Sequence, residues 1–68
     1  MVKIKTIQEI AKKKGLRFEY SEPDQAYVMF DSFSGQAMAI YADITIQLIT
    51  SDKVWREECN KLKPQSKR

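Results

Sequence analysis

The sequence predicts a single small α+β domain with the element order α-β-β-β-α. The chain has 68 residues, of which 43% are hydrophobic, and this is enough for one core but not for two. Both ends show the spacing of amphipathic helices, and the middle shows the alternation of strands separated by turn residues. We expect a three-stranded antiparallel sheet covered on one face by two helices. The domain should span residues 1–63, followed by a flexible basic tail at 64–68.

The first helix is predicted at about residues 7–14. Thr6 and Glu9 have the spacing of a capping box, and an apolar stripe follows at Ile7 and Ile10. Gly15 suits the left-handed position just after a helix end. These signals define both ends of the element.

Three strands follow. Leu16, Phe18 and Tyr20 alternate with charged residues, and residues 21–24 have turn chemistry. Residues 25–31 form the second strand, which is apolar on both sides and therefore typical of a central position. A turn at 31–36 leads to a third strand at 36–42.

The last segment allows two interpretations. Apolar residues recur at near-helical spacing from Asp43, a good N-cap, until Pro64, which favours one long helix. Residues 44–49 also alternate and include β-branched side chains, which favours a fourth short strand followed by a helix from Ser51. The sequence leaves both open.

The alternation also predicts which side chains the helices cover. We expect the covered sheet face to carry six apolar residues, namely Leu16, Phe18, Val28, Phe30, Met38 and Ile40. They should meet five helical residues, namely Ile7, Ile10, Leu48, Trp55 and Leu62. The uncovered face should then present Arg17, Glu19, Tyr27, Met29, Ala37, Ala39 and Tyr41.

Charge is distributed unevenly along the chain. The net charge is +3, but residues 1–17 carry +5, residues 18–52 carry −6 without any Lys or Arg, and residues 53–68 carry +4. An acidic partner would therefore be attracted to the ends and a basic partner to the middle.

Composition argues against catalysis. The chain has no histidine, which removes the commonest general base and the commonest transition-metal ligand. Its one cysteine, Cys59, follows Glu57 and Glu58, which would raise the pKa of the thiol. The acids Glu22, Asp24 and Asp31 lack the order of a calcium loop, and there is no glycine-rich phosphate loop. We expect no enzyme, cofactor, metal or small-molecule substrate; a metal-dependent carboxylate enzyme is the weakest alternative.

The same features bear on location. No apolar stretch approaches the length of a membrane span, and the charged start does not resemble a signal peptide. A single cysteine cannot form a disulfide framework. We expect a cytoplasmic protein that does not bind a membrane.

Protein binding is the leading functional hypothesis. The expected uncovered face is apolar and adaptable, and an aromatic residue at a hairpin tip could anchor in a partner. The residues assigned to this contact are Tyr27, Met29, Phe33, Ala39 and Tyr41. We expect a small accessory or regulatory protein, of the kind common in bacteria and phages, that binds another protein or forms a homo-oligomer through them.

Nucleic-acid binding, to RNA or DNA, is the alternative. A compact basic cluster at the end of the first helix and further lysines near the C-terminus would contact phosphates. The residues assigned to it are Lys12, Lys13, Lys14, Arg17, Lys61 and Lys63.

Overall fold

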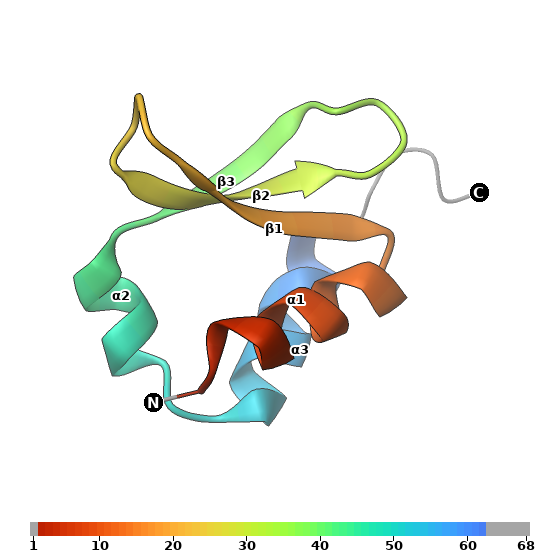
Figure 1. Cartoon of the computed structure of the whole chain (residues 1–68). Helices are drawn as coiled ribbons and strands as arrows, with labels where there is room; N and C mark the ends of the chain where they lie inside the picture. The colour runs from red at the N-terminus through yellow and green to blue at the C-terminus, as the bar shows by residue number, and fades with distance from the viewer. Residues whose placement is uncertain (1, 63–68) are drawn as a thin grey trace.

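Six elements lie between residues 2 and 62, which are the residues described by this computed structural model. They are α1 (Ile4–Lys13), β1 (Leu16–Ser21), β2 (Ala26–Asp31), β3 (Ala37–Tyr41), α2 (Asp43–Leu48) and α3 (Asp52–Leu62). The strands form one antiparallel sheet in the order β1-β2-β3, and the helices lie on one side of it (Figure 1). The α+β class and the three-stranded sheet are confirmed, with one helix more than expected. The expected tail at 64–68 lies outside the described residues.

Helix α1 begins earlier than the sequence predicted. Lys3 is its N-cap and makes no side-chain capping bond, so Thr6 and Glu9 lie inside the helix and the predicted capping box is wrong. The buried stripe at Ile7 and Ile10 is confirmed. Gly15 follows the helix with a φ of 78°, a left-handed conformation that glycine adopts without strain.

The pairing of β1 with β2 corrects the predicted sheet faces. Residues directly opposite one another in an antiparallel pair point to the same face. Phe18 pairs with Met29, and Tyr20 pairs with Tyr27. The odd-numbered side chains of β2 therefore lie on the helix-covered face together with Phe18. The prediction placed Val28 and Phe30 there and was wrong by one residue, which reverses a strand's two faces.

Strand β3 follows β2. Tyr27 pairs with Tyr41 and Met29 with Ala39, so both β3 residues also point toward the helices. Met29 is 0% exposed and Tyr41 is 6% exposed. A shift in register between Met29 and Phe30 leaves one extra residue, Met38, in β3, and this side chain packs against the core. Tyr27, Met29, Ala39 and Tyr41, which were expected on the open face, therefore lie on the covered one.

The open face carries Val28, Phe30 and Ile40, together with Arg17, Glu19 and Ala37, which were expected there. Arg17 lies across Phe30, with its guanidinium carbon 5.2 Å from the ring centroid, and its Nε donates a hydrogen bond of 2.9 Å to Glu19. Val28 is buried between its register partners Glu19 and Ile40. This face is thus partly screened by an ion pair.

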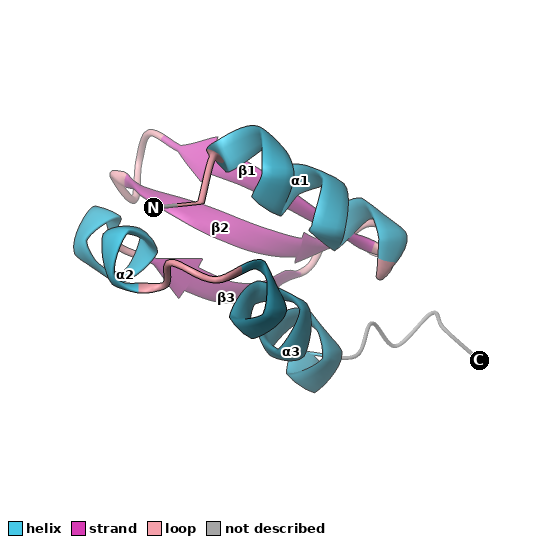
Figure 2. Cartoon of the chain, turned by 90° about the horizontal axis from the view of Figure 1, so that it is seen from below, coloured by secondary structure: helices cyan, strands magenta, loops and turns pink. Residues whose placement is uncertain are grey.

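The segment after β3 forms two helices. Ile49 has an extended backbone at the end of α2, and α3 begins three residues later. Ser51 receives hydrogen bonds from the backbone N–H groups of Lys53 and Trp55 and so caps the second helix. The prediction of a fourth strand is therefore wrong, and the predicted single long helix is interrupted after Leu48. Asp43 is the first helical residue and not the N-cap. Figure 2 shows α2 and α3 as separate helices beside β3.

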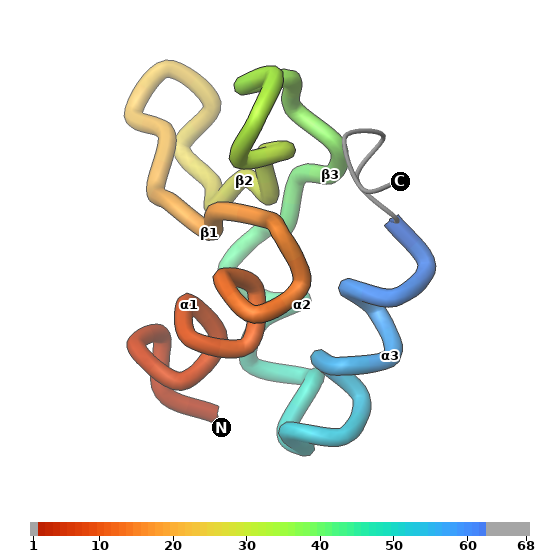
Figure 3. The backbone as a smooth tube through the Cα atoms, turned by 90° about the vertical axis from the view of Figure 1, so that its right-hand side faces the viewer, coloured from red at the N-terminus to blue at the C-terminus, as the bar shows by residue number. Residues whose placement is uncertain are grey.

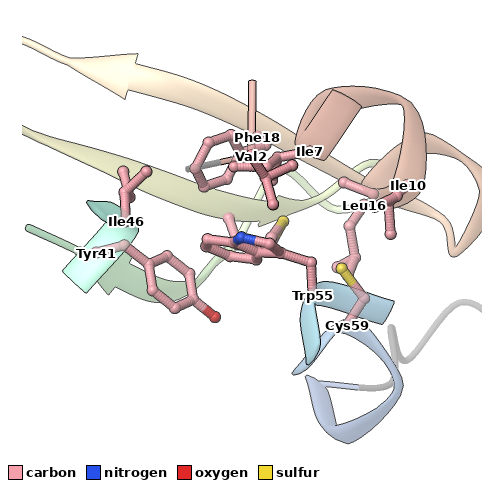
Figure 4. Close-up of a cluster of buried hydrophobic side chains, with 11 residues drawn as sticks. Val2, Ile7, Ile10, Leu16, Phe18, Tyr41, Ile46, Trp55 and Cys59 are labelled. Atoms are coloured by element: carbon pink, nitrogen blue, oxygen red, sulfur yellow. The ribbon is translucent and has the colours of Figure 1, made fainter. Parts of the chain in front are cut away.

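The core is centred on Trp55, which is fully buried. Its ring meets Phe18 at a centroid distance of 5.6 Å and Tyr41 at 5.3 Å, both nearly edge-on (Figure 4). These contacts join α3 to the sheet, and α1 packs on both α3 and β1 (Figure 3). Within residues 2–62, the indole Nε1 of Trp55 is the one buried side-chain nitrogen or oxygen without a hydrogen-bond partner. The aromatic cluster therefore depends on packing at its centre.

Candidate interaction surfaces

Four of the five residues assigned to protein binding do not lie on an open surface. Met29 and Tyr41 are buried in the core, and Tyr27 and Ala39 are half-buried against it. Tyr27 stacks on Phe18, with centroids 5.0 Å apart and planes 6° from parallel. These residues hold the domain together, so the surface predicted from them is not present.

The hydroxyl of Tyr41 has an internal partner. It donates a hydrogen bond of 2.7 Å to Oε2 of Glu58 in α3. Burial, followed by this bond and the charge of Glu58, raises the pKa of Tyr41 far above its usual range. The hydroxyl thus stays protonated and ties β3 to α3.

Cys59 is a structural residue of α3. It is fully buried beneath the sheet, next to Trp55 in Figure 4. Burial, together with the charge of Glu58, raises the pKa of the thiol to about 11, and Lys14 opposes this shift. At neutral pH the group is a thiol and not the thiolate that a nucleophile requires.

Helix α2 exposes an apolar surface that the sequence analysis missed. Ile44 is 63% exposed and Leu48 is 73% exposed, while Ile46 points inward and is buried. Residues four apart lie on the same side of a helix. Ile44 and Leu48 together therefore form one exposed apolar strip, here named the α2 outer face. Leu48 was expected in the core, and that expectation is wrong.

A signal for this surface was present in the sequence. The alternation of Ile44, Ile46 and Leu48 favours a strand with one buried side. In a helix, the same spacing places apolar side chains on opposite sides, because successive residues rotate by about 100°. A six-residue helix built from this segment cannot bury both sides against its own domain.

A shallow pocket lies beside α2. It has a volume of about 170 Å³ and is lined by residues from three elements, namely Ile4, Tyr27, Asp43, Ile46 and Gln47. Cofactor and drug-sized ligand pockets usually have volumes of about 300 to 1,000 Å³. The pocket is therefore suited to one inserted side chain and not to a cofactor.

The lysines of α1 form a basic end of the molecule. Lys12 and Lys13 are exposed in the last turn of α1, and Lys14 is half-buried. Helix α1 packs against α3. Lys61 is exposed in the last turn of α3. The named lysines therefore remain at the surface, except that Lys63 lies outside the described residues.

Arg17 does not belong to this basic end. It lies on the open sheet face, where it contacts Phe30 and Glu19. The Arg17–Glu19 contact is the one ion pair found within residues 2–62, so Lys12, Lys13 and Lys14 have no carboxylate partner there. Sequence proximity grouped Arg17 with the lysines, but the strand directs its side chain elsewhere.

Phe33 is the member of the protein-binding set that remains accessible. It is 75% exposed in the turn between β2 and β3. The adjacent Ser32 bonds twice to the carbonyl oxygen of Gly15, through its backbone nitrogen at 3.1 Å and its Oγ at 2.9 Å. Phe33 is therefore held next to the basic end of α1, a proximity that the sequence did not indicate.

The described part of the chain holds no group of three or more His, Cys, Asp or Glu side chains suited to a metal ion. Within the same residues, no helix has the length and apolarity that crossing a bilayer requires. Comparisons with protein-family models, with curated proteins and with solved structures find no match. The candidate surfaces rest on the geometry of the chain itself.

Proposed function

We propose that this is a small accessory protein without catalytic activity that acts by binding a protein, either a second copy of itself or a different chain. The contact is assigned to the α2 outer face. The observation that supports it is the 63% and 73% exposure of Ile44 and Leu48 on a helix whose opposite side is already buried.

A helix that is apolar on both sides is normally enclosed. Single exposed apolar residues are ordinary on protein surfaces, but here two large ones lie four residues apart on one short helix. Covering them removes apolar area from water at about 25 cal/mol per Å². A domain of this size has a small core and gains from such association.

The free thiol of Cys59 suits a reducing compartment, so we place this activity in the cytoplasm.

The experiment compares Leu48→Glu with the wild type. Self-association is measured by sedimentation equilibrium across micromolar concentrations, and partner retention by immobilised protein in an extract of the cells that produce it. A charge at a buried contact should weaken either association by at least about tenfold.

Val54→Glu is the matched control, because Val54 is an exposed apolar residue of α3 outside the α2 outer face. Both variants should unfold in urea within about 0.5 kcal/mol of the wild type, since neither side chain is buried. A dimer or retained protein that is lost only with Leu48→Glu supports the proposal. If both variants behave as the wild type, or if neither association occurs, the proposal is wrong.

A further inference from the structure

We infer that the basic end of the molecule is a binding site for single-stranded nucleic acid, in which Phe33 stacks on a base while Lys12 and Lys13 contact the adjacent phosphates. The site lies away from the α2 outer face and does not depend on the function proposed above. It rests on the proximity of two segments that are far apart in the sequence.

The first support is the connection between the β2–β3 turn and α1. Both donor groups of Ser32 bond to the carbonyl oxygen of Gly15, which directly follows the lysine run. This connection places Phe33 within two residues of a fixed contact with the end of α1. The turn that carries Phe33 and the end of α1 that carries the lysines therefore lie side by side.

The second support is the rigidity of the turn. One carboxylate oxygen of the buried Asp31 accepts the backbone N–H of Phe33 at 2.8 Å and that of Ser34 at 3.4 Å. Gly35, at a φ of 76°, donates to the carbonyl of Asp31 at 2.8 Å. The network fixes the backbone that carries the ring, so binding orders little more than the rotamer of the Phe33 side chain.

The third support is charge. Lys12 and Lys13 are exposed and make no ion pair within the described residues. Among the acids, Asp31 accepts hydrogen bonds from the turn, Glu58 accepts one from Tyr41, and Glu9 lies four residues before Lys13 on α1. Lysines at a helix C-terminus also complement the helix dipole, but this effect does not explain an exposed aromatic ring beside them.

These features favour a single strand over other anionic partners. Proteins that bind single strands combine cationic side chains for the phosphates with aromatic rings on which bases stack. In a duplex the base faces are already stacked, so a projecting ring has no base face to contact. Anionic membranes also attract lysine and phenylalanine, and they are included as an outcome of the test.

The test is filter binding of radiolabelled oligo-dT and oligo-U of about 12 nucleotides, within the range of single-strand site sizes. We expect binding at low salt that Phe33→Ala weakens at least about fivefold, the lower range for one stacked base, while Phe33→Tyr retains it. The double variant Lys12→Gln/Lys13→Gln should weaken binding and reduce the slope of log K against log salt by about 1.4.

The matched control is Lys53→Gln/Arg56→Gln, which removes the same charge from exposed positions in the first half of α3. It should have a much smaller effect than the α1 double variant, and circular dichroism should show all variants folded. The inference is overturned by the absence of binding, by wild-type affinity in Phe33→Ala, or by an equal loss in the control. Tighter binding to phosphatidylserine vesicles with the same dependence on Phe33 would also overturn it, in favour of a lipid surface.

Discussion

The two faces of the sheet are both apolar, yet they differ in what surrounds them. On the helix-covered face, Phe18, Met29 and Tyr41 pack with Trp55 of α3. On the open face, Phe30 is covered by an arginine side chain of the same sheet. The difference shows that hydrophobicity alone does not determine which face of a small sheet is buried. The buried face is the one that packs against the helices.

Trp55→Ala should have the largest effect on this arrangement. Removing a fully buried tryptophan costs about 3 to 5 kcal/mol, which is comparable to the total stability of a domain of this size. We expect the variant to be unfolded or nearly so at 25 °C by circular dichroism. Trp55→Phe should be milder, because it retains an aromatic ring and removes the unpartnered N–H. A stable Trp55→Ala protein would contradict a core centred on this residue.

Met29 and Phe30 test the two faces directly, because they are neighbours on β2. Met29→Ala should destabilise the protein by about 2 to 5 kcal/mol, as expected for a fully buried side chain. Phe30→Ala should cost less, about 1 to 2 kcal/mol, because the ring is only half-buried and its main contact is Arg17. Urea denaturation measures both variants. A larger loss of stability in Phe30→Ala than in Met29→Ala would support the assignment predicted from the sequence, in which Phe30 faces the helices.

Alkaline pH should weaken the covered face. The pKa of Cys59 is raised to about 11 and that of Tyr41 is also raised, so folding favours the protonated form of each group. The contribution of Cys59 is complete below the ordinary thiol pKa, near 9, and is lost as the pH rises through 11, whereas that of Tyr41 begins to decrease only above its ordinary pKa of 10. Urea midpoints should therefore be lower at pH 10.5 than at pH 8.5.

Cys59→Ala provides the control for this pH dependence. The variant should be less stable at pH 8.5, but its stability should fall less steeply between the two pH values. Below pH 9, a thiol reagent should react with the native protein only through unfolding, because the side chain is fully buried. Rapid reaction without unfolding would contradict the burial of Cys59.

The smallest effect is expected on the open face. Arg17→Gln removes an exposed ion pair and the contact with Phe30, and we expect a loss of no more than about 1 kcal/mol. The loss should decrease further in high salt, because the pair is exposed to solvent. Glu19→Gln, which removes only the ion pair, should cost less than Arg17→Gln. A large loss in either variant would mean that this face contributes more than its exposure indicates.

Local signals in the sequence predicted the elements well. The order of α1 and the three strands, the left-handed conformation of Gly15 and the burial of Trp55 are confirmed. Each depends on chemistry within a few residues, such as the absence of a Cβ atom or the spacing along one helix.

The sequence did not predict the sheet faces. Strand β2 is apolar at nearly every position, so no alternation of polar and apolar residues indicates which of its sides faces the core. The tetrapeptide turn at residues 22–25 sets the pairing, with Ser21 opposite Ala26, and so aligns Phe18 with Met29. The prediction that one common face carries Tyr27, Met29, Ala39 and Tyr41 is correct. It assigned this face to solvent because it took the other alternate residues of β2 as the buried ones.

The candidate surfaces were equally hard to predict. The exposed side of α2 depends on the end of that helix near Ile49, which no proline or glycine marks. The proximity of Phe33 to the lysines depends on the hydrogen bonds from Ser32 to Gly15. These two residues are 17 positions apart in the chain. Only the lysines themselves could be recognised from composition, because charged side chains remain at the surface in almost any fold.

The burial of Trp55 also means that the intrinsic fluorescence of the protein reports on its core. The chain contains one tryptophan, so all indole emission comes from the centre of the core. Its native spectrum should lie at short wavelength and shift to the red only when α3 separates from the sheet. A ligand at Phe33 or on the α2 outer face would leave this spectrum unchanged, which allows binding to be distinguished from unfolding without any label.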